Sequence, residues 1–278
     1  MSLDAAAKKR VLFLGEEITD VYHYGKAIGM PRKAPIIALE YRHSEAFQGG
    51  VIAAARHAES LCATVHIASA CRVRKERYLE DSQNRKLFEV YAGTEALPRP
   101  LLCGIEDYDC VVVTDYGHGM MDARLIEQVC HQARFLAVNV QTNAGNYGFN
   151  LATKYPKANY LCMDEVEARL ATQNRDGAIE DSLEELSSIS SRVAITLGKE
   201  GAIGKDRHGV VRCEAIKTHV VDTMGSGDAF FAVTAVLAEE TPMAELLRIG
   251  NAAGKIKAMT LGHRKAVTKH DLLAYLGR

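Results

Sequence analysis

The chain has 278 residues, of which 47% are hydrophobic and 25% charged, so it is long enough to build one substantial α/β domain. Its formal net charge of -1, with no long run of lysine or arginine, argues against a nucleic-acid-binding surface as the main function. No stretch approaches the roughly 18 consecutive apolar residues of a membrane span, so neither nucleic acid nor a membrane is expected as a partner.

The first residues and the cysteines indicate the cellular compartment in which the protein is expected. The start of the chain, MSLDAAAKK, has no hydrophobic region like that of a signal peptide, and we interpret residues 1–9 as a flexible leader. An odd number of cysteines without a Cys-x-x-Cys pair suits reduced, mostly buried thiols better than disulfides or a zinc site, so we expect a cytoplasmic protein. The seven cysteines are Cys62, Cys71, Cys103, Cys110, Cys130, Cys162 and Cys213.

Short apolar runs that end in glycine or a polar residue predict the buried strands of a sheet. These runs lie at 10–15, 110–117, 135–140, 158–163 and 192–198. Helix-length segments lie at 49–61, 122–133, 164–171 and 182–189, and residues 227–276 look helical throughout. Buried strands that alternate with helices predict one domain over 1–278, a doubly wound, mostly parallel sheet with helices on both faces. Active sites in such folds gather at the carboxyl ends of the strands.

Two stretches interrupt this alternation. Residues 20–47 hold short runs of Tyr, Ile and Val around a Gly-Met-Pro turn, which predicts paired strands outside the main sheet. We expect this segment to form a small β lid. Residues 72–91 are charged at both ends and suit either two further strands or a strand and a helix, and their periodicity does not decide between the two.

The string DTMGSGD, at 222–228, stands directly before an almost wholly apolar run. Gly225, Ser226 and Gly227 can turn their backbone amides toward one point, where the positive dipole end of the following helix favours an anion. Asp228, in the first turn of that helix, would lie beside the anion and could accept a proton from a hydroxyl that attacks a phosphoryl group. The competing interpretation is an ordinary glycine turn in which Asp228 only stabilises the helix start.

The longer string VVDTMGSGDAFFA resembles the C-terminal signature of the ribokinase-like carbohydrate kinases, the PfkB family. GEEITDVYHYG, a glycine pair before the first long helix, DYGHG, TLGKEGA and NAAGKIKAMTLG follow in the order that the family uses, so the resemblance covers nearly the whole chain. Within the family, the lid region and DYGHG most resemble the heptose-phosphate kinase branch. The resemblance implies a ribokinase-like fold whose β lid often also forms a dimer contact, and hence a homodimer.

By this resemblance the chain is an ATP-dependent kinase of a sugar or sugar phosphate, in which Asp228 is the catalytic base and the amides of 225–227 form the anion hole. Asp20 matches an aspartate that binds a sugar hydroxyl. Gly49 and Gly50 match a pair that lets the sugar approach a helix start. From the residues alone, Asp20 equally suits a turn at a strand end, and the glycine pair a simple helix start.

The resemblance also implies ATP and Mg²⁺ as cofactors. Glu167 matches a glutamate that organises the water shell of Mg²⁺, and Asp164, on the same helix face, stands where the family has asparagine. Acidic residues in the first turn of a helix are also expected from the helix dipole alone. A strand, turn and strand would explain the string TLGKEGAIG almost as well as a nucleotide site. The residues implied to hold the nucleotide are Thr196, Gly198, Gly201, Thr223 and Asn251.

The chain departs from the family pattern mainly on the sugar side. Ala53 stands where GG-x-x-N has asparagine, residues 139–141 read Asn-Val-Gln in place of Asp-Pro-Lys, Glu16 replaces an aspartate, and a segment after residue 70 is missing. Two hypotheses remain, an active kinase with an altered acceptor and a catalytically degenerate binding or regulatory domain of a larger sugar-nucleotide enzyme. Retention of Asp228 and Glu167 favours the first.

A basic cluster of four residues, Arg72, Arg74, Lys75 and Arg77, lies within the undecided segment. As a solvated strand face, this cluster needs no ligand. If the acceptor is already phosphorylated, the same residues are candidates to hold its distal phosphate.

Overall fold

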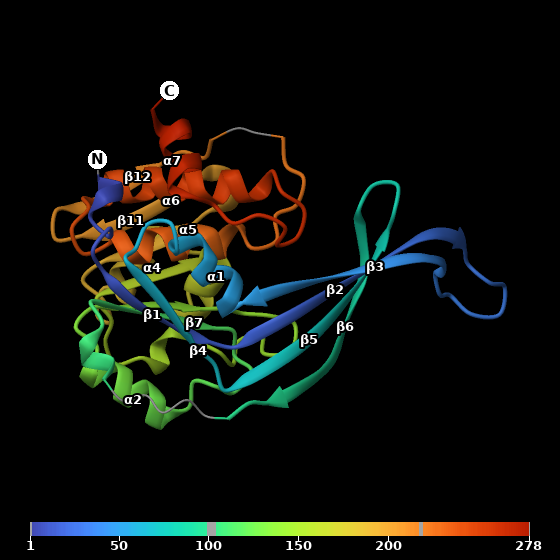
Figure 1. Ribbon diagram of the computed structural model, residues 1–278, viewed down its shortest axis with the longest axis horizontal. Helices are drawn as coiled ribbons and strands as arrows, with labels where there is room; N and C mark the ends of the chain where they lie inside the picture. Colours follow the sequence, from blue (N-terminus) through green and yellow to red (C-terminus); the bar gives the residue numbers. More distant parts are fainter. Residues whose placement is uncertain (1, 99–103, 217–218, 278) are drawn as a thin grey trace.

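The computed structural model describes residues 2–98, 104–216 and 219–277, which form two sheets (Figure 1). The main sheet has eight strands in the order β12-β11-β10-β9-β8-β7-β1-β4. From β4 to β10 neighbouring strands run parallel, and β10, β11 and β12 pair antiparallel, which confirms the predicted mostly parallel sheet. The strands are β1 (Arg10–Gly15), β4 (Thr64–Ala68), β7 (Cys110–Asp115), β8 (Leu136–Val140), β9 (Tyr160–Asp164), β10 (Val193–Thr196), β11 (Ala202–Asp206) and β12 (Gly209–Cys213).

Helices cover both faces of the main sheet. Side chains alternate along a strand, so Val11 and Phe13 of β1 pack into one core, and Leu12 and Leu14 pack into the other. Helices α1, α5, α6 and α7 complete the first core, and α2, α3 and α4 complete the second. The helices are α1 (Val51–Ala58), α2 (Ala123–Gln132), α3 (Glu165–Ala171), α4 (Ile179–Leu186), α5 (Ser226–Leu237), α6 (Met243–Ala258) and α7 (Lys269–Leu276).

Helix α5 is the most enclosed of these elements. Every residue from Ala229 to Leu237 is buried, in agreement with its apolar sequence on all sides. Because packing on all sides holds the helix still, the position of its amino end is fixed relative to the sheet.

The second sheet is the lid, which projects from the body as an arm (Figure 1). Its strand order is β3-β2-β5-β6, with β2 antiparallel to β3, β2 parallel to β5 and β5 antiparallel to β6. The prediction of paired strands at 20–47 is confirmed, and the undecided segment at 72–91 forms two further strands, so the lid is larger than expected. The lid strands are β2 (Glu17–Gly29), β3 (Ala38–Gly50), β5 (Cys71–Glu80) and β6 (Arg85–Ala96).

Two expectations about the chain ends need correction. Leu3 and Ala6 are buried in the first core, so the expectation of a flexible leader is wrong for these residues. The region 227–276 is not helical throughout, since the loop 259–268 separates α6 from α7 and contributes to the site described below.

No helix in the described ranges is both long and apolar enough to cross a membrane. All cysteines within those ranges are free thiols, as expected, and Cys103 lies outside the described residues.

Candidate active site

Asp228 lies in the first turn of α5, at the carboxyl edge of the parallel strands. The Tyr116 hydroxyl, directly after β7, donates a hydrogen bond to Asp228 Oδ1 at 3.1 Å, and the Gln141 side-chain amide, directly after β8, donates to the same oxygen at 2.6 Å. Within the described ranges, no hydrogen bond reaches Oδ2. One carboxylate oxygen is therefore fixed by two donors, and the other can accept a proton.

The surroundings of Asp228 also adjust its basicity. Burial raises the pKa of Asp228, while the charge of His263 and the hydrogen bonds from Gln141 and Tyr116 oppose the rise. A carboxylate with a raised pKa takes up a proton more readily than an exposed aspartate does. The site thus suits a general base.

The glycine turn before α5 partly matches the predicted anion hole. Gly225 has a φ of 73°, in the left-handed region that favours glycine. The Ser226 amide donates to the Thr223 carbonyl at 3.1 Å and is occupied within the loop, whereas the Gly227 amide donates to no described residue. Ser226 Oγ is buried and has no partner among the residues described, and no atom lies within 4 Å of a Cβ built on Gly227. The turn therefore offers unfilled donors and open space.

A pocket of about 750 Å³ opens beside this turn. All five residues predicted to hold the nucleotide line the pocket, together with Ser226 and Gly227 of the turn. The side-chain amide of Asn251 donates to the carbonyls of Cys213 and Glu214, at 3.2 and 3.1 Å, so it shapes the wall of the pocket. Much of the remaining wall is apolar, which suits the base of a nucleotide.

Asp20, the predicted sugar ligand, lies buried on β2 at the base of the lid. Its carboxylate forms an ion pair with Arg77 of β5, and His263 Nε2 lies 3.4 Å from Asp20 Oδ2. Burial would raise the pKa of Asp20, but the hydrogen bond from His263 and the charge of Arg77 outweigh burial and hold it below the usual range. Asp20 is therefore an ionised carboxylate that already has two partners.

The predicted glycine pair lies directly against Asp20. A Cβ on Gly49 would lie 2.5 Å from Asp20 Oδ2 and 3.3 Å from His263 Nε2. Gly50 has a φ of 62° and caps the start of α1. Both glycines therefore allow a close approach of backbone and side chains, and the approach of a sugar to this helix start stays a prediction.

The basic cluster of the lid is divided between two faces of β5, because successive side chains of a strand point in opposite directions. Arg72 and Arg74 lie on the outer face and pair with neighbouring glutamates. Lys75 and Arg77 lie on the inner face and are buried. The expectation of one solvated basic face is thus wrong for Lys75 and Arg77.

Lys75 faces an unusual environment for a buried lysine. Its Nζ lies 4.9 Å from the centroid of the Tyr91 ring and forms no ion pair with a carboxylate of the described chain. Burial lowers its pKa. His118 lies near the same ring, at 6.3 Å between centroids, and its buried Nε2 has no described partner. Burial and the charge of Lys75 lower the pKa of His118 to about 4.

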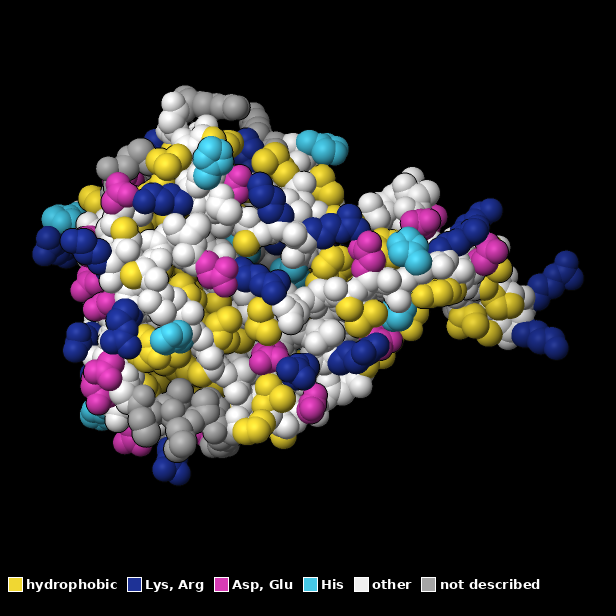
Figure 2. All heavy atoms as spheres, in the orientation of Figure 1, with side chains coloured by type: hydrophobic (Ala, Val, Ile, Leu, Met, Phe, Trp, Pro, Cys, Tyr) yellow, Lys and Arg dark blue, Asp and Glu magenta, His cyan; other side chains and the backbone are white. Residues whose placement is uncertain are grey.

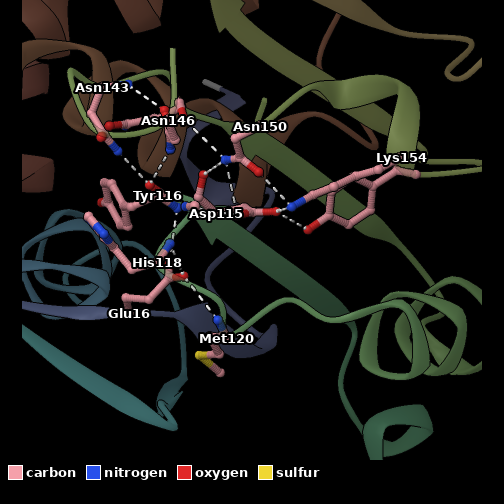
Figure 3. Close-up of polar contacts among 12 residues, drawn as sticks. Glu16, Asp115, Tyr116, His118, Met120, Asn143, Asn146, Asn150 and Lys154 are labelled. Carbon is pink, nitrogen blue, oxygen red and sulfur yellow. Dashed lines mark hydrogen bonds and ion pairs between the residues drawn. The ribbon is translucent and has the colours of Figure 1, made fainter. Parts of the chain in front are cut away.

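Glu16, noted in the sequence as a departure from the family pattern, organises the loop that carries Tyr116 and His118 (Figure 3). Its carboxylate accepts hydrogen bonds from the backbone amides of Tyr116, His118 and Met120 at 3.0, 3.0 and 3.3 Å. Burial and the neighbouring charge of Asp115 raise the pKa of Glu16, while these amides oppose the rise. The longer side chain thus replaces the expected aspartate in a structural role.

The far side of the same loop is held by side-chain amides, as Figure 3 shows. Asn143 and Asn146 donate to the Tyr116 carbonyl at 2.8 and 3.0 Å, and Lys154 pairs with Asp115 at 2.5 Å. These contacts fix Tyr116, and through it one hydrogen bond of Asp228.

Glu167 and Asp164, the predicted metal residues, form a capping box at the start of α3. Glu167 Oε2 accepts from the Asp164 amide at 2.8 Å, and Oε1 accepts from the Thr142 amide at 2.9 Å. Burial and the charge of Asp164 raise the pKa of Glu167. No group of three or more His, Cys, Asp or Glu side chains in the described ranges is arranged to hold a metal ion. A role of Glu167 toward Mg²⁺ through water therefore stays a prediction.

Sequence reasoning missed several residues around the base. Tyr116 belongs to the DYGHG string, and Gln141 was noted only as a departure from the family pattern. His263 had no local signal, and Arg77 was noted only as part of a basic cluster, because the two reach Asp20 from a loop and from a lid strand that lie far apart in the sequence.

A doubly wound sheet, a β lid and a carboxylate at a glycine-rich helix start beside a large pocket define a kinase of the ribokinase-like class. The model of the pfkB family of carbohydrate kinases matches residues 105–269. The chain belongs to this family, whose members are phosphotransferases that act on sugars.

Individual relatives agree with this assignment. The chain is 21% identical over 299 residues to the bifunctional protein HldE of Helicobacter acinonychis, covering 91% of this chain and 64% of that protein. It is 34% identical over 97 residues to the ATP-dependent 6-phosphofructokinase isozyme 2 of Escherichia coli, covering 33% of this chain and 31% of that protein. The ribokinase of Arabidopsis thaliana, complexed with ribose and ATP, superposes with a TM-score of 0.71 at 14% identity, covering 98% of this chain and 99% of that chain.

The curated relatives are longer than the matched region. The chain spans between about a third and just under two thirds of their length, for example 35% of the HldE protein of Campylobacter jejuni and 64% of that of Helicobacter acinonychis.

Proposed function

We propose that this chain transfers the γ-phosphoryl group of ATP to a hydroxyl of a sugar or sugar phosphate, with Asp228 as the base. The observation that carries the proposal is the placement of Asp228. One of its oxygens is held by Tyr116 and Gln141, and the residue lies in the first helical turn beside Ser226 and Gly227, which line the large pocket. The base thus lies between a nucleotide-sized space and the carboxylate of Asp20 on the sugar side.

In the proposed reaction, ATP occupies the pocket with its phosphates toward Ser226 and Gly227. The unfilled donors of the turn and the helix dipole stabilise negative charge on the transferring group. As the bond from the sugar oxygen to the γ-phosphorus forms and the bond to the β-phosphate oxygen breaks, Asp228 Oδ2 takes the hydroxyl proton. Mg²⁺ would neutralise phosphate charge, with Glu167 ordering its water shell. The similarity in fold to a ribokinase that is complexed with ATP supports the choice of donor.

The inner face of the lid supports an acceptor that carries an anionic group, such as a heptose-phosphate-like sugar. Lys75 and His118 face one space without carboxylate partners in the described chain, while Arg77 is already paired with Asp20 and Glu89. A buried ammonium without a counter-ion is costly unless a ligand provides one. A phosphate would supply that charge and hydrogen-bond acceptors for both residues.

One observation favours the alternative of a degenerate binding or regulatory domain. Asp20 is engaged by Arg77 and His263, so a sugar hydroxyl would have to share or displace these partners. The greater length of the curated relatives is compatible with a domain of a larger enzyme. The two hypotheses differ in phosphoryl transfer and can be separated by experiment.

The test compares the wild-type protein with Asp228→Asn. Calorimetric titration with ATP, with and without Mg²⁺, should show metal-dependent binding to both proteins, since Asn keeps the shape of the side chain. Turnover of the best sugar or sugar phosphate acceptor should fall about 10²- to 10⁴-fold in Asp228→Asn, the usual contribution of a general base.

The matched control is Asp181→Asn, which changes an acidic residue in the first turn of α4, away from the pocket. This variant should keep full turnover. That result would show that removal of an acidic side chain from the first turn of a helix does not by itself abolish activity. Retention of most turnover in Asp228→Asn would show that the base is misassigned. Absence of ATP binding by the wild type would favour the degenerate domain.

A further inference from the structure

Lys257 of α6 is completely buried, although lysine is rarely so enclosed. Its Nζ donates hydrogen bonds to the backbone carbonyls of Met224 at 2.8 Å and Gly262 at 2.7 Å. No carboxylate of the described chain lies within ion-pair distance of it. The ammonium is thus held by carbonyl oxygens, as a small monovalent cation would be.

The two residues that Lys257 contacts are also held by Asp222. Asp222 Oδ1 accepts from the Met224 amide at 3.1 Å, and Oδ2 accepts from the Gly262 amide at 3.0 Å. One carboxylate therefore holds both amides and one ammonium holds both carbonyls. This clamp joins the turn before α5 to the loop 259–268.

The clamp lies directly behind the candidate active site. Met224 precedes Gly225 of the anion-binding turn, and Gly262 precedes His263, which contacts Asp20. A Cβ on Gly225 would lie 3.3 Å from Lys257 Cε and 3.0 Å from His263 Cε1. The charge of Lys257 also acts on Asp228, whose pKa it helps to lower against the effect of burial. Lys257 is therefore placed to fix the orientation of the turn and to make the electrostatic potential at Asp228 more positive.

We propose that Lys257 is a positioning residue that acts as a tethered monovalent cation for the phosphoryl-transfer site. A free K⁺ or NH₄⁺ ion among carbonyl oxygens would supply the same single charge, but its occupancy would depend on its concentration. The covalent link makes the charge permanent, so order in the turn does not depend on added monovalent ions. The catalytic part of this inference rests on the proposed function, whereas the clamp itself can be tested without turnover.

The experiment measures the melting temperature and ATP binding in chloride salts of potassium, ammonium and N-methylglucamine at equal ionic strength. The wild type should give the same values in all three salts. Lys257→Ala should lower the Tm by about 10 °C in N-methylglucamine, because the buried carbonyls of Met224 and Gly262 lose the donor that holds them together. Ammonium or potassium should restore part of that loss by entering the vacated space, and N-methylglucamine is too large to do so.

Two further variants sharpen the test. Lys257→Met fills the space with an apolar chain, so its Tm should be low in every salt. Lys9→Ala removes another buried lysine, one paired with Glu239 at 2.8 Å, and should show no preference among the salts. With a working acceptor, kcat of Lys257→Ala should fall about 10- to 100-fold, less than the roughly 10²- to 10³-fold loss for a direct anion-stabilising donor because Lys257 acts through the turn, and should recover partly in ammonium.

Several results would overturn the proposal. A wild type whose Tm or ATP affinity rises sharply in potassium would show that a free ion is still required. This measurement uses only the wild-type protein, so it does not depend on whether a variant folds. A folded Lys257→Ala protein that matches the wild type, or that responds equally to all salts, would show that the ammonium is not a tethered cation. If no acceptor is ever turned over, the proposed function fails while the melting experiment still decides the role of the clamp.

Discussion

Substitution of Lys75 tests whether the buried cations of the lid bind the acceptor or only stabilise the lid. It is buried beside Tyr91 and His118 without a carboxylate partner in the described ranges, whereas Arg74, on the outer face of the same strand, pairs with Glu76 at 2.7 Å. Lys75→Met should raise the KM for a phosphorylated acceptor about tenfold or more, because a charge-assisted hydrogen bond is lost, and should leave the KM for ATP unchanged.

Arg74→Met is the matched control, since it removes a cation from the outer face of β5. This variant should leave both KM values near those of the wild type. If Lys75→Met binds the phosphorylated acceptor normally, or if both variants weaken binding equally, then Lys75 does not hold the anionic group.

At the residue scale, the positions that could be predicted from the sequence are those that belong to a local motif. DTMGSGD determines the backbone of one turn, so Gly225 and Asp228 lie where the string places them, and the five predicted nucleotide residues line one pocket. Tyr116, Gln141 and Lys257 could not be assigned in the same way. They reach the site from three separate segments, and nothing in their local sequence states that tertiary packing brings them together.

At the scale of elements, the buried strands and α5 were predictable because an apolar run is stable only in the core of the protein. The paired strands β2 and β3 of the lid were also predictable, but β5 and β6 were not, since β5 carries charged residues on both faces. Its inner face holds Lys75 and Arg77 beside Val73 and Leu79, and a buried charge has no sequence pattern that distinguishes it from a solvated one. Pairing with Asp20 and Glu89 makes the burial of Arg77 possible.

The contact of α5 with α6 gives a prediction about stability. A Cβ on Gly250 of α6 would lie 2.6 Å from the Phe230 ring of α5, so Gly250→Ala forces the two helices apart. Alanine gains about 0.5–1 kcal/mol of helix propensity over glycine, but overpacking costs about 1–3 kcal/mol, so the free energy of unfolding should fall.

Gly254→Ala, one turn further along the same helix, is the control for helix propensity. Its Cβ would lie 3.3 Å from the Ser226 carbonyl oxygen and 4.0 Å from Phe230 Cβ, so the crowding is smaller. Urea denaturation should therefore rank Gly250→Ala below Gly254→Ala in stability. The reverse order would mean that the Phe230 ring can move aside at little cost.

At the scale of the whole molecule, charged contacts attach the lid to the body at two places. Lys86 of β6 pairs with Asp222 at 2.9 Å, and Arg264 of the loop 259–268 pairs with Glu45 of β3. These contacts join the lid to the same loops that Lys257 clamps. The lid, the glycine turn before α5 and the loop 259–268 are therefore all connected through Asp222.

The far end of the lid points away from the body and carries exposed apolar side chains, which Figure 2 shows as a patch at the end of the arm. Ile28, Met30, Ile36 and Ile37 are 63%, 71%, 57% and 48% exposed. Burying a large aliphatic side chain contributes about 1.5–3 kcal/mol, so contact with a second copy would stabilise the arm and also cover its strand edges. We propose that the chain forms a homodimer through this patch.

The last prediction follows from this patch. Light scattering coupled to gel filtration should find a dimer for the wild type and a monomer for the double variant Ile36→Lys, Ile37→Lys, because two charges in an apolar interface cannot be solvated. Phe149→Lys changes a side chain that is 93% exposed outside the lid and should leave the dimer intact. A wild type that stays monomeric at every concentration, or a dimer that survives the lid substitutions, would place the partner surface elsewhere. If the monomeric variant also loses acceptor affinity while it still binds ATP, the dimer contact holds the lid over the sugar site as well.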